Sequence, residues 1–120
     1  MHESLKKENL IVKSSFELAV QTIPFCDSLD GMRKWSLSNQ ILRAALSIGA
    51  NVKEAQNAES KNDFIHKMKI AAKEAEELEY YFEICMASES LPNCNLLLEK
   101  TQTVCKILSK IISTSKTSNS

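Results

Sequence analysis

The segment from Gln40 to Phe64 places apolar residues on two faces of one predicted helix, and this pattern constrains the fold most. A helix on a protein surface usually shows a single apolar stripe, facing the core. A helix that is apolar on two sides must contact more than one neighbour, so we expect a central helix, with part of its polar face buried. The main stripe and the one beside it consist of Ile41, Ala45, Ile48, Val52 and Ala55, and of Leu42, Leu46 and Gly49.

Composition favours helices throughout the chain. Two glycines and two prolines are few for 120 residues, and Ala, Leu, Lys, Glu and Ser dominate, most of which are good helix formers. A chain of this length forms one domain with one core. The Asp30–Gly31 pair predicts the end of a first helix, with glycine in the left-handed conformation that is common at such ends.

Apolar periodicity and capping residues predict helices over about 9–29, from Ser36 or Ser38 to 58, 61–90 and 95–113. Ser60 with Asp63 resembles a capping box and marks the start of the third helix. Short connections then favour an all-α, antiparallel up-down-up-down four-helix bundle. Residues 9–113 form this bundle, with a flexible N-terminus over 1–8 and a disordered tail over 114–120.

The first helix also has two apolar faces. One face carries Ile11, Leu18, Phe25 and Leu29, and the adjacent one carries Val12, Phe16, Ala19 and Ile23. If these second faces remain outside the core, the chain assembles into a dimer or a larger oligomer. Gly49 in mid-helix predicts close approach of another backbone, with a merely tolerated glycine as the alternative.

A polar row follows the third face of the second helix: Gln40, Arg43, Ser47, Asn51 and Glu54. Helical residues three and four apart share a face. If the second and third helices are antiparallel about a turn near Glu59, Glu74 and Glu77 lie opposite Arg43, and Lys67 can reach Asn51 or Glu54. We interpret the row as a structural network that fixes helix register; the alternative is a ligand site or a carboxylate pair for acid–base chemistry.

We expect no enzyme, no cofactor and no metal, because no catalytic or metal-ligating set occurs at a suitable spacing. His66 has no partner histidine or carboxylate at ligand spacing, which favours a surface role. The cysteines form no CxxC pair, so we expect free, mostly buried thiols in a reducing compartment. They are Cys26, Cys85, Cys94 and Cys105.

Charge gives no overall attraction to nucleic acid or to a membrane surface, because 15 basic and 15 acidic residues cancel. With neither a membrane-spanning stretch nor a signal peptide, a cytoplasmic location is expected.

The C-terminal part is basic, which favours either solubility or contacts to a nucleic-acid backbone. Those candidate contacts are Lys100, Lys106, Lys110 and Lys116. Outward members of the aromatic run 80–82 are expected to contact another subunit, with base stacking as the alternative.

Three motifs together carry a family resemblance. They are Gln40-x-Leu42-Arg43-Ala44-Ala45-x-Ser47-Ile48-x-x-Asn51-x-x-Glu54-Ala55, Ser60-Lys61-x-Asp63-Phe64-Ile65 and Lys73-Glu74-Ala75-x-Glu77. Over nearly its whole length the chain resembles the bacterial four helix bundle protein family, which includes proteins encoded in intervening sequences of large-subunit ribosomal RNA genes and is sometimes filed as a ribosomal-protein family. Its relatives include the accessory protein of diversity-generating retroelements.

The resemblance implies a homopentamer of four-helix subunits, and it supplies no catalytic residues. We therefore expect a non-enzymatic oligomeric scaffold or interaction protein that associates with RNA or an RNA-processing partner. The alternative is a nucleic-acid-binding accessory protein that uses the basic ends of the fourth helix around a ring.

Overall fold

The computed structural model describes residues 2–117, and the side chains of 10–117. The described chain consists of four α-helices without any strand: α1 His2–Gly31, α2 Trp35–Ala55, α3 Lys61–Ala87 and α4 Asn95–Thr117. The prediction of an all-helical, four-helix fold is confirmed.

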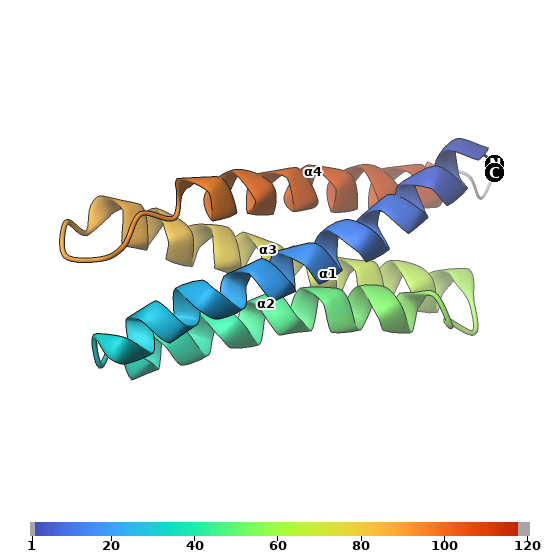
Figure 1. Cartoon of the computed structure of the whole chain (residues 1–120). Helices are drawn as coiled ribbons and strands as arrows, with labels where there is room; N and C mark the ends of the chain where they lie inside the picture. The colour runs from blue at the N-terminus through green and yellow to red at the C-terminus, as the bar shows by residue number, and fades with distance from the viewer. Residues whose placement is uncertain (1, 118–120) are drawn as a thin grey trace.

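The helices form a closed cycle of neighbours in which α1 contacts α2, α2 contacts α3, α3 contacts α4, and α4 contacts α1. Consecutive helices run in opposite directions (Figure 1). The α1–α2 and α3–α4 connections lie at one end of the bundle. The α2–α3 connection lies at the other end, together with the start of α1 and the end of α4.

The core is formed by one apolar stripe from each helix. The largest fully buried side chains include Ile11, Ile48, Phe82 and Leu108, one from each of the four helices. Phe25 packs edge-on against Phe82 with ring centroids 5.7 Å apart, which links α1 to α3 across the bundle. Each large apolar side chain buried in this way stabilises the fold by about 1.5–3 kcal/mol.

The start of α3 has the predicted cap. The Asp63 backbone N–H donates to Ser60 Oγ at 3.0 Å, and the Asp63 carboxylate accepts from the Glu59 N–H at 3.3 Å. The Asp63 N–H is one of the backbone donors that helix geometry leaves without partners. The Glu59 N–H, which lies before the cap residue, is satisfied as well. A serine cap of this kind contributes about 1 kcal/mol.

The predicted cap of α2 is wrong. The helix begins at Trp35, before either serine, and Lys34 precedes it without a side-chain cap. Ser38 is instead buried inside the helix, where its hydroxyl donates to the Cys26 carbonyl at 3.2 Å. This cross-helix bond explains why a polar residue is tolerated at that depth.

The turn between α1 and α2 also differs from the prediction. Gly31 is not left-handed; the described residue with a positive φ is Arg33, at 63°. The helix continues through Gly31, and the Lys34 N–H donates to the Leu29 carbonyl at 2.8 Å, so the reversal falls at Arg33. A non-glycine residue in this conformation costs about 1 kcal/mol.

The bundle extends beyond the predicted limits of 9–113. The α1 backbone is helical from His2, over most of the stretch expected to be flexible, because its lysines and glutamates are good helix formers. At the other end α4 includes residues 114–117 of the expected tail, and Thr117 Oγ1 donates to the Ser113 and Thr114 carbonyls. α2 and α3 end somewhat earlier than predicted, at Ala55 and Ala87. Residues 1 and 118–120 lie outside the described chain.

Gly49 faces the α1 backbone, as predicted, but the contact does not require glycine. A Cβ atom added at Gly49 would lie 3.7 Å from the Ser15 carbonyl oxygen, an ordinary van der Waals separation. The two helices therefore leave room for a methyl group.

We predict that Gly49→Ala stabilises the chain by about 0.5–1 kcal/mol, because alanine loses less backbone entropy in a helix than glycine does. The melting temperature should rise by about 3–6 °C. Thermal unfolding followed by circular dichroism measures this, and a lowered melting temperature would show that α1 and α2 need a closer approach.

Candidate interaction surfaces

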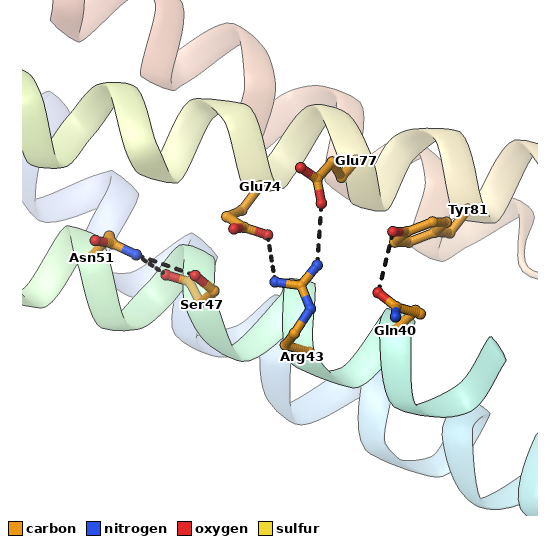
Figure 2. A network of polar contacts seen from close by, with 7 residues as sticks. All are labelled: Gln40, Arg43, Ser47, Asn51, Glu74, Glu77 and Tyr81. Atoms are coloured by element: carbon orange, nitrogen blue, oxygen red, sulfur yellow. Dashed lines mark hydrogen bonds and ion pairs between the residues drawn. The ribbon is translucent and has the colours of Figure 1, made fainter. Parts of the chain in front are cut away.

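The centre of the polar row is Arg43, which bridges α2 to α3 (Figure 2). Its Nη1 lies 3.1 Å from Glu74 Oε1, and its Nη2 lies 3.1 Å from Glu77 Oε1. The hydrogen bond to Glu74, together with that carboxylate's charge, raises the pKa of Arg43, and the hydrogen bond to Glu77 adds to it. One guanidinium thus holds two carboxylates that lie on successive turns of α3.

Other members of the row pair separately along the same α2–α3 interface. Tyr81 donates its hydroxyl to Gln40 Oε1 at 3.4 Å (Figure 2). Lys67 reaches Glu54 at 3.0 Å rather than Asn51, and this hydrogen bond raises the pKa of Lys67. Asn51 turns back along its own helix, where its Nδ2 donates to the Ser47 carbonyl at 2.9 Å and to the Ser47 hydroxyl at 3.2 Å.

We expected part of the polar row to be buried, and this expectation is wrong for the residues of α2 that form ion pairs. The Arg43 and Glu54 side chains are 49% and 58% exposed. The reason is that the buried stripe of α2 packs against both α1 and α3, which leaves the row along the outer edge of the α2–α3 interface. Both carboxylates opposite Arg43 are held as acceptors by the same cation. This geometry supports a register contact better than acid–base chemistry.

A groove between α1 and α2 is lined mainly by apolar side chains and has a volume of about 600 Å³. Its apolar residues include Val12, Phe16, Val20, Ile23, Leu46 and Ala50; we call it the α1/α2 groove. Phe16 is 67% exposed, and Val20 and Leu46 are each 49% exposed. The sequence pattern identified the second face of each helix, but not that antiparallel packing places the two faces side by side.

The basic residues of α4 do not form one patch. Lys100 donates to Gln21 Oε1 at 2.6 Å, on the side of α4 that faces α1. Lys116 lies on the α3 side, close enough to Lys69 to lower the pKa of that ammonium group. Lys106 and Lys110 lie one turn apart and are exposed.

The aromatic run 80–82 divides among three environments. Tyr80 is 60% exposed, Tyr81 packs toward α2, and Phe82 is in the core. Only Tyr80 is therefore well placed for a contact with another molecule. His66, as predicted, is exposed.

The cysteines are free thiols, and Cys26, Cys85 and Cys94 are buried as expected. Burial raises the pKa of the Cys85 and Cys105 thiols to about 11, so both are protonated at neutral pH.

In the described part of the chain, no group of three or more His, Cys, Asp or Glu side chains is placed to hold a metal ion. None of the described helices is both long enough and apolar enough to cross a membrane.

We predict that Arg43→Ala lowers the unfolding free energy by about 1 kcal/mol, because each exposed ion pair contributes about 0.2–1 kcal/mol. High salt should reduce the difference, since it screens exposed charges. Chemical denaturation of both proteins at low and high salt measures this. The matched control is Lys73→Ala, an exposed α3 lysine, which should change stability little. A loss above about 3 kcal/mol is expected only for a buried network and would contradict the exposed geometry.

Comparison with known proteins agrees with this architecture. A search of the curated proteins found no match. A crystal structure of a protein of unknown function from the S23 ribosomal protein family, from Bacteroides thetaiotaomicron, is similar at 36% identity and a TM-score of 0.83. The similarity covers 89% of this chain and 98% of that chain. The family model described as 23S rRNA-intervening sequence protein matches residues 7–110. The chain therefore belongs to the 23S rRNA-intervening sequence protein family.

Proposed function

We propose that this protein is a non-enzymatic helical scaffold that functions as an assembly of identical subunits, with the α1/α2 groove covered in that assembly. The observation that carries this proposal is the groove itself. Phe16, Val20, Ile23 and Leu46 are each more than 40% exposed, and all belong to one surface. Contiguous apolar surfaces of this kind mark interaction sites, whereas scattered apolar residues do not.

The energetics favour coverage of the groove. A phenylalanine left in water forgoes about 1.5–3 kcal/mol that burial would provide, and the neighbouring apolar side chains add to this. Aromatic residues that fill pockets at the centre of an interface often dominate its binding energy. The family resemblance implies five copies arranged in a ring, and we propose that number for this chain.

The family's name refers to intervening sequences of 23S ribosomal RNA, and this link motivates a proposal that involves RNA. We propose that the assembled scaffold associates with RNA or with a protein that processes RNA. In such a complex the protein would serve as a scaffold that provides binding surfaces.

A second candidate function, direct binding of nucleic acid, is favoured by one observation. Lys116 of α4 lies close enough to Lys69 of α3 to lower the pKa of the Lys69 ammonium group. An anion placed between them, such as a phosphate of a nucleic-acid backbone, would relieve this repulsion. In a ring of subunits, the pair would be repeated around the assembly.

The test of assembly is Phe16→Glu. In wild type we expect a mass of two or more copies of the 13.5 kDa chain. The glutamate places a charge in the groove and should weaken each interface by about 2 kcal/mol or more, which is about thirtyfold in the dissociation constant. Size-exclusion chromatography with light scattering measures the mass.

The matched control is Leu96→Glu, at an α4 residue that is 64% exposed and lies outside the groove. This variant should assemble like wild type, and circular dichroism should show that both variants fold. Assembly that survives Phe16→Glu unchanged would contradict the proposed role of the groove.

The test of nucleic-acid binding is titration of RNA at low salt, about 50 mM, where phosphate contacts are strongest. If the second function holds, the double variant Lys69→Glu with Lys116→Glu binds more weakly and shows a shallower salt dependence. Lys34→Glu, at the opposite end of the bundle, is the control and should bind like wild type. Wild-type protein that binds no RNA at this salt concentration would eliminate the second function.

A further inference from the structure

A second exposed apolar strip lies on α3. Tyr80 is 60% exposed and Ile84, one turn further along, is 41% exposed. Glu76 and Glu83 are exposed on the same side of the helix, since they are four residues before and three residues after Tyr80. We call these four residues the α3 ridge. It presents two apolar side chains next to two acidic ones.

The charges of the α3 ridge and the α1/α2 groove are opposite. The groove is lined by Lys13 and Lys53 and by no carboxylate. Glutamates Glu74 and Glu77 of α3 are held by Arg43, whereas neither Glu76 nor Glu83 takes part in any of the described ion pairs. The α3 ridge of a second copy therefore carries negative charge, which the lining of the groove lacks.

The lengths of the two surfaces also correspond. From Val12 to Ile23 the groove follows α1 for about 16 Å, at about 1.5 Å per residue. From Glu76 to Ile84 the ridge covers about 12 Å on the same basis. Since α1 and α2 are antiparallel and Gly49 lies against Ser15, Lys13 and Lys53 lie near the same end of the groove. A ridge with Glu76 at that end places Tyr80 and Ile84 along the apolar part.

A subunit cannot fill its own groove with its own ridge. The groove belongs to α1 and α2, whereas the ridge residues are exposed on α3. The α3 side chain that contacts α1 is Phe82, which packs against Phe25 on the core side of the helix. Contacts between unlike surfaces are head-to-tail, and repeated contacts of this type form closed rings or filaments. Contacts between like surfaces form twofold dimers instead.

We infer that the α3 ridge of one copy docks in the α1/α2 groove of the next, with Glu76 near Lys13 and Lys53. This inference rests on the proposed self-assembly and assigns the second surface that it uses. The interface is head-to-tail, and each subunit contributes one groove and one ridge.

The test mixes two variants, each of which lacks one surface. Phe16→Glu blocks the groove, and the double variant Tyr80→Glu with Ile84→Glu blocks the ridge. Each variant alone should be a monomer of 13.5 kDa. Mixed in equal amounts, they should form a heterodimer and nothing larger, because one intact groove meets one intact ridge and the two remaining surfaces are blocked. Native mass spectrometry with one variant isotopically labelled identifies the pair.

A charge reversal gives an independent readout. Lys13→Glu with Lys53→Glu should weaken assembly by about tenfold, and adding Glu76→Lys to the same chain should restore most of that loss. Leu96→Glu again provides the control for an exposed apolar residue outside both surfaces.

Two outcomes would overturn the inference, and they distinguish failure of the head-to-tail pairing from failure of self-assembly. If the ridge variant assembles like wild type while the groove variant does not, the groove self-associates through another surface, and only the head-to-tail pairing fails. If wild type itself is a monomer, the proposed self-assembly fails and the pairing fails with it. Circular dichroism of each variant establishes that the bundle is folded in every arm.

Discussion

The packing of α2 between α1 and α3 is the contact on which the rest of this structure depends. Ile41, Ile48 and Val52 are almost completely buried, and they fix how α2 lies against both neighbours. One consequence is that the polar row of α2 lies at the outer edge of the interface with α3. The other is that Leu46 and Ala50 lie beside the outer face of α1, where they complete the α1/α2 groove.

Much of this architecture could be predicted from local chemistry. Apolar periodicity identified four helices, the Ser60 cap located the start of α3, and reflection through the α2–α3 turn found Glu74 and Glu77 as partners for Arg43. These features depend on residues near one another in sequence or on a single short turn. Physical rules about faces and register are sufficient for them.

The features that could not be predicted depend on tertiary context. Ser38 has the residue type of a helix cap, but its hydroxyl bonds to Cys26 across the α1–α2 interface, which no local pattern reveals. The turn conformation at Arg33 was missed because Gly31 is the better candidate on intrinsic grounds. Burial of the polar row was overestimated because a second apolar face was taken to mean a central helix. In a bundle of single subunits, each helix already has two neighbours.

The apolar residues that remain outside the core are the basis of the function that we propose. The described surface carries a groove that is apolar and basic and a ridge that is apolar and acidic. Self-assembly is the simplest account that uses both. The most direct measurement is the native mass of the unmodified chain at micromolar concentration. Our account predicts an assembly of several 13.5 kDa chains, five in the ring that we propose, and a single 13.5 kDa species would contradict it.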